Sequence, residues 1–281
     1  MRLLAVVLAF ASSACIDLAG ADVGRYVERE EKRFTVTGRP DVSVSTFDGS
    51  VEVRPWDRSE VEVIVEKHAG SKESAASMTV EAQQNGSHVS VDVRAPHASG
   101  FGFHMGRSAK LIVSVPAGTD LVAKSGDGSI DVERITGNVD LHSGDGSIRA
   151  RSLDGDVSVT TGDGSIAVDG AFGALRAHSG DGSVRVVAAN RGRVGHDWDI
   201  TTGDGSVTLE IPATFGAELD AHTGDGRIRL EEVTVSEVSG QIGRNSVKGR
   251  IGEGGATVRI RTGDGSITLR SARPSGTGDS R

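Results

Sequence analysis

Residues 139–168 read VDLHSGDGSIRARSLDGDVSVTTGDGSIAV and contain the pattern that determines the fold. Apolar residues alternate with polar ones on both sides of each Gly-Asp-Gly-Ser motif, as at Val157 and Val159 before the second motif and Ile166 and Val168 after it. A period of two is typical of β-strands with one buried face. Each motif is therefore predicted to be a turn between two strands.

The Gly-Asp-Gly motif recurs along the second half of the chain. It occurs seven times, with aspartates at Asp127, Asp145, Asp163, Asp181, Asp204, Asp225 and Asp264. The first three intervals are 18 residues, and the later ones are 23, 21 and 39. Repeats of this size cannot bury an apolar face alone, so they stack on one another. We expect an all-β protein, a right-handed parallel β-solenoid with coils of about 18 residues, because parallel crossovers are right-handed.

The residues of the turn have physical roles. The second glycine allows a positive φ without a Cβ clash, and the Asp and Ser side chains can bond nearby backbone amides. A hydroxyl residue precedes every turn, at positions 125, 143, 161, 179, 202, 223 and 262. These hydroxyls are predicted to form a ladder inside the corner that keeps the strands in register.

The first residues of the chain have the features of a secretory signal. Arg2 is followed by an apolar run from Leu3 to Phe10, which is too short to span a bilayer, and then by small residues before Cys15, the only cysteine. Small residues followed by cysteine resemble a bacterial lipobox, although Ser12 stands where that motif usually has leucine. The resemblance implies cleavage before Cys15 and a lipid anchor on it. The alternative is an ordinary cleavage site with an incidental cysteine.

The chain divides into five segments by composition and pattern. We expect a signal peptide over residues 1–14, a lipid-anchor tether over 15–33, an N-terminal β region over 34–110, the solenoid over 111–270 and a flexible tail over 271–281. Within the N-terminal β region, Asn85-Gly86 predicts a hairpin and Ser71–Ser77 a short helical turn.

Charge and aromatic content exclude some functions. The formal net charge is -8, with both signs interspersed, which argues against nucleic-acid binding because that function favours basic stripes. Only 7 Phe, 2 Trp and 1 Tyr are present, so a deep aromatic pocket would be hard to build.

Most of the chain, residues 34–270, resembles the bacterial DUF4097 family, whose members are catalogued as putative adhesins. The resemblance rests on Asp48–Val53 followed by Trp56, on the SGDGSI repeats, on Ile211-Pro212 and on residues 247–269. It implies a β-helical fold and a location in the cell envelope, and it supplies no catalytic residues.

The stacked turn aspartates are a candidate calcium site. Carboxylates on neighbouring coils, about 4.8 Å apart, repel one another, and calcium between the coils would offset the repulsion. The calcium column would comprise Asp127, Asp145, Asp163 and Asp181. The alternative, which we favour, is that the carboxylates point into water and the turns are purely structural. No other metal or cofactor is expected.

Two sets of outward positions recur beside the turns. His142, His178 and His222 precede the turn, but Thr160 separates the first two, so we expect a solvated face and no shared metal. The arginines that follow the turn, Arg149, Arg185 and Arg229, are expected to pair with neighbouring acids.

The loop over residues 97–105 is the best candidate for partner contact. It contains Phe101, Phe103, His104 and Met105 in a chain poor in aromatic residues. The alternative is that these residues cap the open end of the solenoid.

Together these features predict a non-enzymatic, membrane-anchored lipoprotein of the bacterial envelope, periplasmic or surface-facing. It would be an adhesin or scaffold that presents a repetitive β face to an unknown protein or glycan, with no role in nucleic-acid binding. Two alternatives stay open: a polysaccharide-active lyase or hydrolase on the same scaffold, and a structural protein that self-associates end to end.

Overall fold

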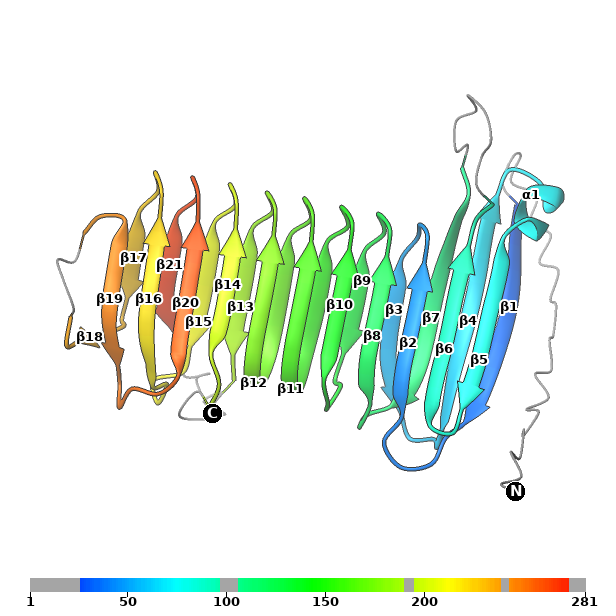
Figure 1. Ribbon diagram of the computed structural model, residues 1–281, viewed down its shortest axis with the longest axis horizontal. Coiled ribbons are helices and arrows are strands. Elements are labelled where there is room, and N and C mark those ends of the chain that lie inside the picture. Colours follow the sequence, from blue (N-terminus) through cyan, green and yellow to red (C-terminus); the bar gives the residue numbers. More distant parts are fainter. Residues whose placement is uncertain (1–25, 97–105, 190–194, 239–242, 273–281) are drawn as a thin grey trace, which may run out of the picture. The chain divides into compact units, whose positions relative to one another are not determined.

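The computed structural model describes residues 26–96, 106–189, 195–238 and 243–272. These residues form an all-β protein with a large mixed, largely parallel sheet and one short helix. The chain comprises two compact units, residues 1–136 and 137–281 (Figure 1). Cys15 and the loop residues Phe101, Phe103, His104 and Met105 lie outside the described residues.

The first unit contains two ladders of strands. Its elements are β1 (Tyr26–Thr35), β2 (Asp41–Thr46), β3 (Val51–Trp56), β4 (Glu60–Ala69), α1 (Lys72–Ala76), β5 (Thr79–Asn85), β6 (His88–Arg94), β7 (Ser108–Pro116), β8 (Asp120–Ser125) and β9 (Ile130–Glu133). One ladder has the order β5-β6-β2-β8 and the other β1-β4-β7-β3-β9. The strands β2, β6 and β8 are parallel, as are β3, β7 and β9, whereas β1, β4 and β5 are antiparallel to their neighbours.

Local signals in the first unit are confirmed by the structure. Asn85-Gly86 joins β5 to β6 in a hairpin, with Gly86 at φ 61°. The short helix α1 begins after Ser71, whose side chain accepts a hydrogen bond from the Ser74 amide.

The predicted tether is wrong over residues 26–33, which belong to β1. Three inward positions of this strand carry charged side chains, Glu28, Glu30 and Lys32, so the sequence lacks the apolar alternation of a strand. These side chains and Lys67 of β4 form an ion cluster in which Lys67 contacts Glu28 and Glu30 and Lys32 contacts Glu30. The Lys67 side chain is only 5% exposed. Pairing with β4 and neutralisation of charge, more than apolar burial, therefore hold β1 in place.

The second unit also contains two ladders. Its strands are β10 (Val139–Ser143), β11 (Ile148–Thr161), β12 (Ile166–Ser179), β13 (Val184–Ala188), β14 (Trp198–Thr202), β15 (Val207–Ile211), β16 (Ala217–Thr223), β17 (Ile228–Glu231), β18 (Val235–Ser236), β19 (Ser246–Ile251), β20 (Thr257–Thr262) and β21 (Ile267–Ser271). The ladder before the turns has the order β10-β11-β12-β14-β20-β16-β19-β18, and the ladder after them β11-β12-β13-β15-β21-β17. The long strands β11 and β12 run through both ladders.

Strand pairs joined by a turn do not stack in chain order. The last pair, β20 and β21, lies between the pair β14/β15 and the pair β16/β17. In the first unit, β2 and β3 likewise lie between β6/β7 and β8/β9. Each unit therefore inserts the strand pair closest to a chain terminus between two others.

The core is made of small aliphatic side chains that alternate inward along the strands. The largest fully buried side chains include Leu141, Ile148, Ile166, Ile200 and Leu209. The second unit also buries an aromatic cluster, in which the Trp198 ring lies 5.7 Å from Phe172 and 5.4 Å from Phe215, centroid to centroid.

The role predicted for the second turn glycine is wrong. A positive φ is absent at positions 128, 146, 164, 182, 205, 226 and 265, and it occurs at Gly155 in the opposite corner, with φ 144°. In the turn itself the constraint is space, because a Cβ on Gly182 would lie closer than 3.0 Å to the backbone of Gly164 in the neighbouring turn. Glycine lets the turns stack at strand spacing.

The predicted hydroxyl ladder is confirmed. Thr161 Oγ1 donates to the Gly146 carbonyl at 2.9 Å, and Thr202 Oγ1 donates to the Gly182 carbonyl at 2.8 Å. The same oxygens accept from their own turns, as Ser179 Oγ does from the Gly182 amide at 3.0 Å. Thr262 Oγ1 bonds to Gly205 and Thr223 Oγ1 to Gly265, so the ladder follows the spatial order of the turns and not the chain order.

Candidate binding surface

In each unit the turn aspartates lie along an exposed edge. Asp145, Asp163 and Asp181 of the second unit are exposed, and Asp127 is exposed at the corresponding turn of the first unit. Among the described residues, no group of three or more His, Cys, Asp or Glu side chains is placed to hold a metal ion. The calcium column stays a prediction, and the exposed carboxylates are placed where water screens their repulsion.

One aspartate at this edge of the first unit is partly buried. Burial raises the pKa of Asp48, the negative charge of Asp127 raises it further, and a hydrogen bond from the Gly49 amide opposes both. Stacked carboxylates therefore do interact where the turn is less exposed to water.

The ladder before the turns presents polar and charged rows to solvent. His142, Thr160, His178, Thr201, Arg261 and His222 form one row in register, which confirms that the histidines are solvated and that Thr160 separates the first two. In the adjacent row, Asp220 bonds to Arg261, whose guanidinium lies 3.0 Å away and lowers the pKa of Asp220.

The ladder after the turns carries the arginines singled out by the sequence. Arg149 stands opposite Ala167, which stands opposite Arg185, and the same row continues through Thr208 and Thr268 to Arg229. The pairing expected with neighbouring acids is confirmed for Arg185, whose Nη2 lies 3.0 Å from Glu210 Oε2.

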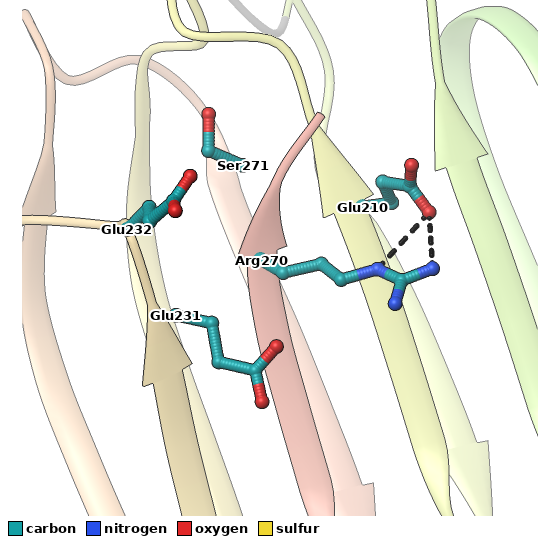
Figure 2. A pocket seen from close by; sticks show the side chains of 5 residues that line it. All are labelled: Glu210, Glu231, Glu232, Arg270 and Ser271. Atoms are coloured by element: carbon teal, nitrogen blue, oxygen red, sulfur yellow. Dashed lines mark hydrogen bonds and ion pairs between the residues drawn. The ribbon is translucent and has the colours of Figure 1, made fainter. Parts of the chain in front are cut away.

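Two shallow hollows open on this ladder. The first, here called the arginine hollow, has a volume of about 130 Å³ and is lined by Arg149, Arg151, Ala167, Val168, Asp169, Arg185 and Val187. The second, here called the acidic hollow, has a volume of about 400 Å³ and is lined by Glu210, Glu231, Glu232, Arg270 and Ser271. Figure 2 shows Arg270 reaching across to Glu210, with Glu231 and Glu232 on the other side of it.

Glu210 forms ion pairs with an arginine of each hollow, Arg185 and Arg270. Its Oε2 accepts from Arg185 at 3.0 Å, from Arg270 Nη2 at 2.7 Å and from Arg270 Nε at 3.1 Å. The arginine hollow has an excess of basic side chains and the acidic hollow an excess of acidic ones, and Glu210 pairs with one arginine from each.

Sequence reasoning did not find the acidic hollow. Arg270 and Glu210 are 60 residues apart and meet only because β21 lies beside β15. The outward positions after each turn could have been listed from the sequence. Which of them are neighbours depends on the inserted strand pair.

One family model matches most of the chain, in two overlapping segments. The family model described as Toastrack DUF4097 matches residues 41–187 and, a second time, residues 137–270. The chain belongs to the Toastrack DUF4097 family. The predicted resemblance is thus confirmed. All residues that line the arginine hollow of this Toastrack chain, and all that line the acidic hollow except Ser271, lie within the second match.

Several solved structures are similar to the Toastrack chain at low identity. A "putative cell adhesion protein" from Clostridium sporogenes is 13% identical, with a TM-score of 0.40, over 87% of this chain and 100% of that one. A "putative adhesin" from Bacteroides fragilis is 10% identical, with a TM-score of 0.41, over 86% of this chain and 96% of that one. A "putative lipid binding protein" from Parabacteroides distasonis is 12% identical, with a TM-score of 0.34, over 86% and 96%.

No curated protein matches the Toastrack chain. The part of the chain that the structure describes contains no helix with the length and apolar character needed to cross a membrane.

Proposed function

We propose that this protein is a non-enzymatic adhesin or scaffold of the bacterial cell envelope that presents its β ladders to a protein or glycan partner. The observation that carries the proposal is the register of exposed side chains in the second unit. On both ladders, polar and charged groups repeat at strand spacing above a core of buried Val, Ile and Leu. Such a surface offers many small, evenly spaced contacts.

The framework under these rows is well suited to hold them in place. Backbone amides of successive turns bond to one another, as Gly180 N does to Gly162 O at 2.5 Å and Gly203 N to Gly180 O at 2.5 Å. The buried hydroxyl ladder adds a side-chain bond at each step. Because the surface is already ordered, a partner that binds it loses little free energy to the ordering of side chains and loops.

We further infer that the strand pairs are coils of a right-handed β-solenoid. Between β10 and β13 the partners are 18 residues apart, as Val139 is from Val157 and Ile166 from Val184, except at the corner over residues 153–155 of β11, where the offset is 17. An offset that equals the sequence repeat is what one coil per repeat requires. The right-handed sense follows from the chirality of parallel crossovers.

Membrane attachment is proposed to occur through a lipid on Cys15. The support is the signal-like sequence before it and its place as the only cysteine. Cys15→Ser should move the protein from the membrane fraction to the soluble fraction, because two or more acyl chains are needed for stable anchoring. Retention of the variant in membranes would contradict the anchor.

The decisive experiment is a binding screen of the full chain, extracted in mild detergent, against envelope proteins and bacterial glycans. Every glycan that binds should also be incubated with the protein and analysed for shorter products. Binding without turnover is the expected result. Turnover that disappears in Glu231→Gln or Glu232→Gln would replace the adhesin proposal by a polysaccharide-active enzyme, since paired carboxylates catalyse glycoside cleavage.

End-to-end self-association is disfavoured at the β1 edge of the first unit. Inward-pointing charges on an edge strand, here Glu28, Glu30 and Lys32, oppose pairing with another sheet. Sedimentation of the purified protein should accordingly show no filaments, and concentration-dependent fibres would favour the structural alternative.

A further inference from the structure

In the arginine hollow, two arginine side chains are separated by a space whose width is set by the strand spacing. Arg149 and Arg185 occupy the same outward row on β11 and β13, two strand spacings or about 9.6 Å apart. Ala167 lies between them, and its short side chain leaves the space over β12 open. Both guanidinium groups can therefore reach a single group placed over Ala167.

The side chains that line the hollow include more basic than acidic groups. Three arginines and one aspartate give a net charge of about +2 in a chain whose overall formal charge is -8. Asp169 is engaged with the backbone, because its Oδ2 accepts from the Ser152 amide at 2.8 Å. That bond supports the bend after Arg151, where Ser152 has φ 54°.

Arg149 and Arg185 retain donors for a ligand. Arg149 is exposed and has no hydrogen bond or ion pair within the described part of the chain. Arg185 contacts Glu210 through Nη2, which leaves most of its five N–H donors free, and its side chain is 51% exposed. Guanidinium groups match the planar geometry of a carboxylate and bind it through two parallel hydrogen bonds.

The surroundings of the hollow favour a hydrated ligand over a protein. Protein interfaces depend on buried aromatic or large apolar anchors. Among the described residues the only large hydrophobic side chain that is exposed is Val27, in the first unit. A half-buried valine, Val187, borders the arginine hollow and offers a small apolar wall, enough for the C–H face of a sugar ring.

We propose that the arginine hollow binds the carboxylate of a uronic acid residue in an acidic polysaccharide, with Arg149 and Arg185 bracketing the carboxylate over Ala167. This inference rests on the proposed function and names the class of its partner. The acidic hollow, towards β17, would repel the same polymer and so confine it to the β11–β13 side of the ladder.

The test uses the full chain and measures binding of oligogalacturonate by isothermal titration calorimetry. The comparison ligands are the same oligomer with its carboxylates methyl-esterified and sulfated dextran of similar length. We expect binding to oligogalacturonate that weakens as salt rises, and at least tenfold weaker binding to the ester. Equal binding to the ester, no binding to oligogalacturonate, or binding to sulfated dextran alone would overturn the assignment.

Variants connect the binding to the hollow. Arg149→Gln with Arg185→Gln should weaken binding about tenfold or more, and Ala167→Glu should abolish it by placing a carboxylate where the ligand would lie. The matched control is Arg176→Gln, an exposed arginine of β12 on the other ladder, which should bind as the parent does. All four positions point outward, so melting temperatures should stay near that of the parent, and Ala167→Glu should not lower it.

The two proposals fail in different ways. Turnover of oligogalacturonate with intact dependence on Arg149 and Arg185 would refute the non-enzymatic function and leave the site standing. Binding of another envelope component that is unaffected by these variants, with no oligogalacturonate binding, would refute the site and leave the adhesin proposal standing.

Discussion

Both units place the strand pair nearest a chain terminus between two others, but they differ in what surrounds that pair. In the first unit the ladders continue into antiparallel strands, and the inner face of β1 is filled by the ion cluster of Lys67, Glu28, Glu30 and Lys32. In the second unit only the ladder before the turns continues into antiparallel strands, β19 and β18, and the interior contains the cluster of Phe172, Trp198 and Phe215.

This difference indicates that the repeated turn determines the spacing between stacked strand pairs. Residues that depart from the repeat determine the order in which the pairs stack. One Gly-Asp-Gly-Ser turn can stack on any other, because each offers the same carbonyls and the same hydroxyl. Strand pairs differ from one another only at residues that depart from the apolar repeat, such as the charged residues of β1 and the aromatic Trp198. The two units can therefore be tested separately by changing one kind of feature in each.

The largest effect is expected from ending the chain at Ala256, which removes β20 and β21. This change exposes the ladders of β14/β15 and β16/β17 and deletes the buried side chains of Val258, Ile260, Ile267 and Leu269. Each such side chain contributes about 1.5–3 kcal/mol, so the loss approaches the whole stability of a typical domain. The second unit should lose its cooperative thermal transition.

Hydrogen exchange measured by mass spectrometry gives the internal control for this truncation. Amides of β4 and β7 in the first unit should stay protected while those of β14 and β16 exchange rapidly. Protection of β14 and β16 equal to that in the full chain would show that the inserted pair does not hold the second unit together.

The next effect separates crowding from backbone conformation. Gly182→Ala places a Cβ against the backbone of the neighbouring turn and should cost about 3 kcal/mol. Gly86→Ala in the first unit meets open space but has φ 61°, and should cost about 1 kcal/mol. Gly195→Ala, with neither constraint, is the control. Chemical denaturation would rank the three, and a cost for Gly86→Ala above that for Gly182→Ala would contradict the role of crowding.

A smaller effect is expected at the ion cluster of the first unit. Lys67→Met leaves Glu28 without its cation and Glu30 with Lys32 alone, and should destabilise the unit by about 2 kcal/mol, less than for a fully buried pair because the glutamates are partly exposed. Adding Glu30→Leu to that variant should recover part of the loss. A double variant that is less stable than Lys67→Met alone would show that the cluster does not act through charge.

The same cluster predicts the response to acid. Burial alone would raise the pKa of Glu30, but hydrogen bonds and charge from Lys67 and Lys32 outweigh it and lower the pKa below 4.5. Because the unfolded chain binds the proton more readily, this stabilisation is present above about pH 4.5 and is lost as the pH falls through the lower folded value. Melting curves of the parent and Glu30→Gln should therefore converge in acid.

The smallest effect concerns Asp48, whose pKa is raised by burial and by Asp127. The charged carboxylate is then less favourable in the folded state, so its cost is present at neutral pH and disappears below about pH 3.8. Asp48→Asn should raise stability at neutral pH by less than about 1 kcal/mol and bring no gain at pH 3. Asp163→Asn, at an exposed turn of the second unit, should change little, and an equal gain in both would count against stacking repulsion.

Much of the fold could be predicted from the sequence because the inward positions of most strands are apolar or hydroxylic and recur with a period of two. Val157, Val159 and Thr161 all point into the core, and their period of two identifies a strand without any partner being known. The hydroxyl ladder could be predicted for the same reason, since every turn repeats it. By contrast, β1 has charged residues at three of its inward positions, so its sequence lacks the apolar alternation that would have identified it as a strand.

The order of the strand pairs could not be predicted. The interval of 39 residues between Asp225 and Asp264 indicates a break in the repeat, but it does not say that the next pair returns to lie beside β14. The acidic hollow depends on that return, because it brings Arg270 to Glu210. The arginine hollow lies where the repeat is regular, so its row of Arg149, Ala167 and Arg185 follows from the sequence spacing.

The inserted strand pair also has a mechanical consequence. A force applied to the C-terminal end of the chain does not peel an edge strand, because β20 is hydrogen-bonded to both β14 and β16, and β21 to both β15 and β17. Four strand pairings must break before the pair can leave. Force at the C-terminal end is therefore opposed by both neighbours of the inserted pair, in a chain whose single cysteine allows no intramolecular disulfide.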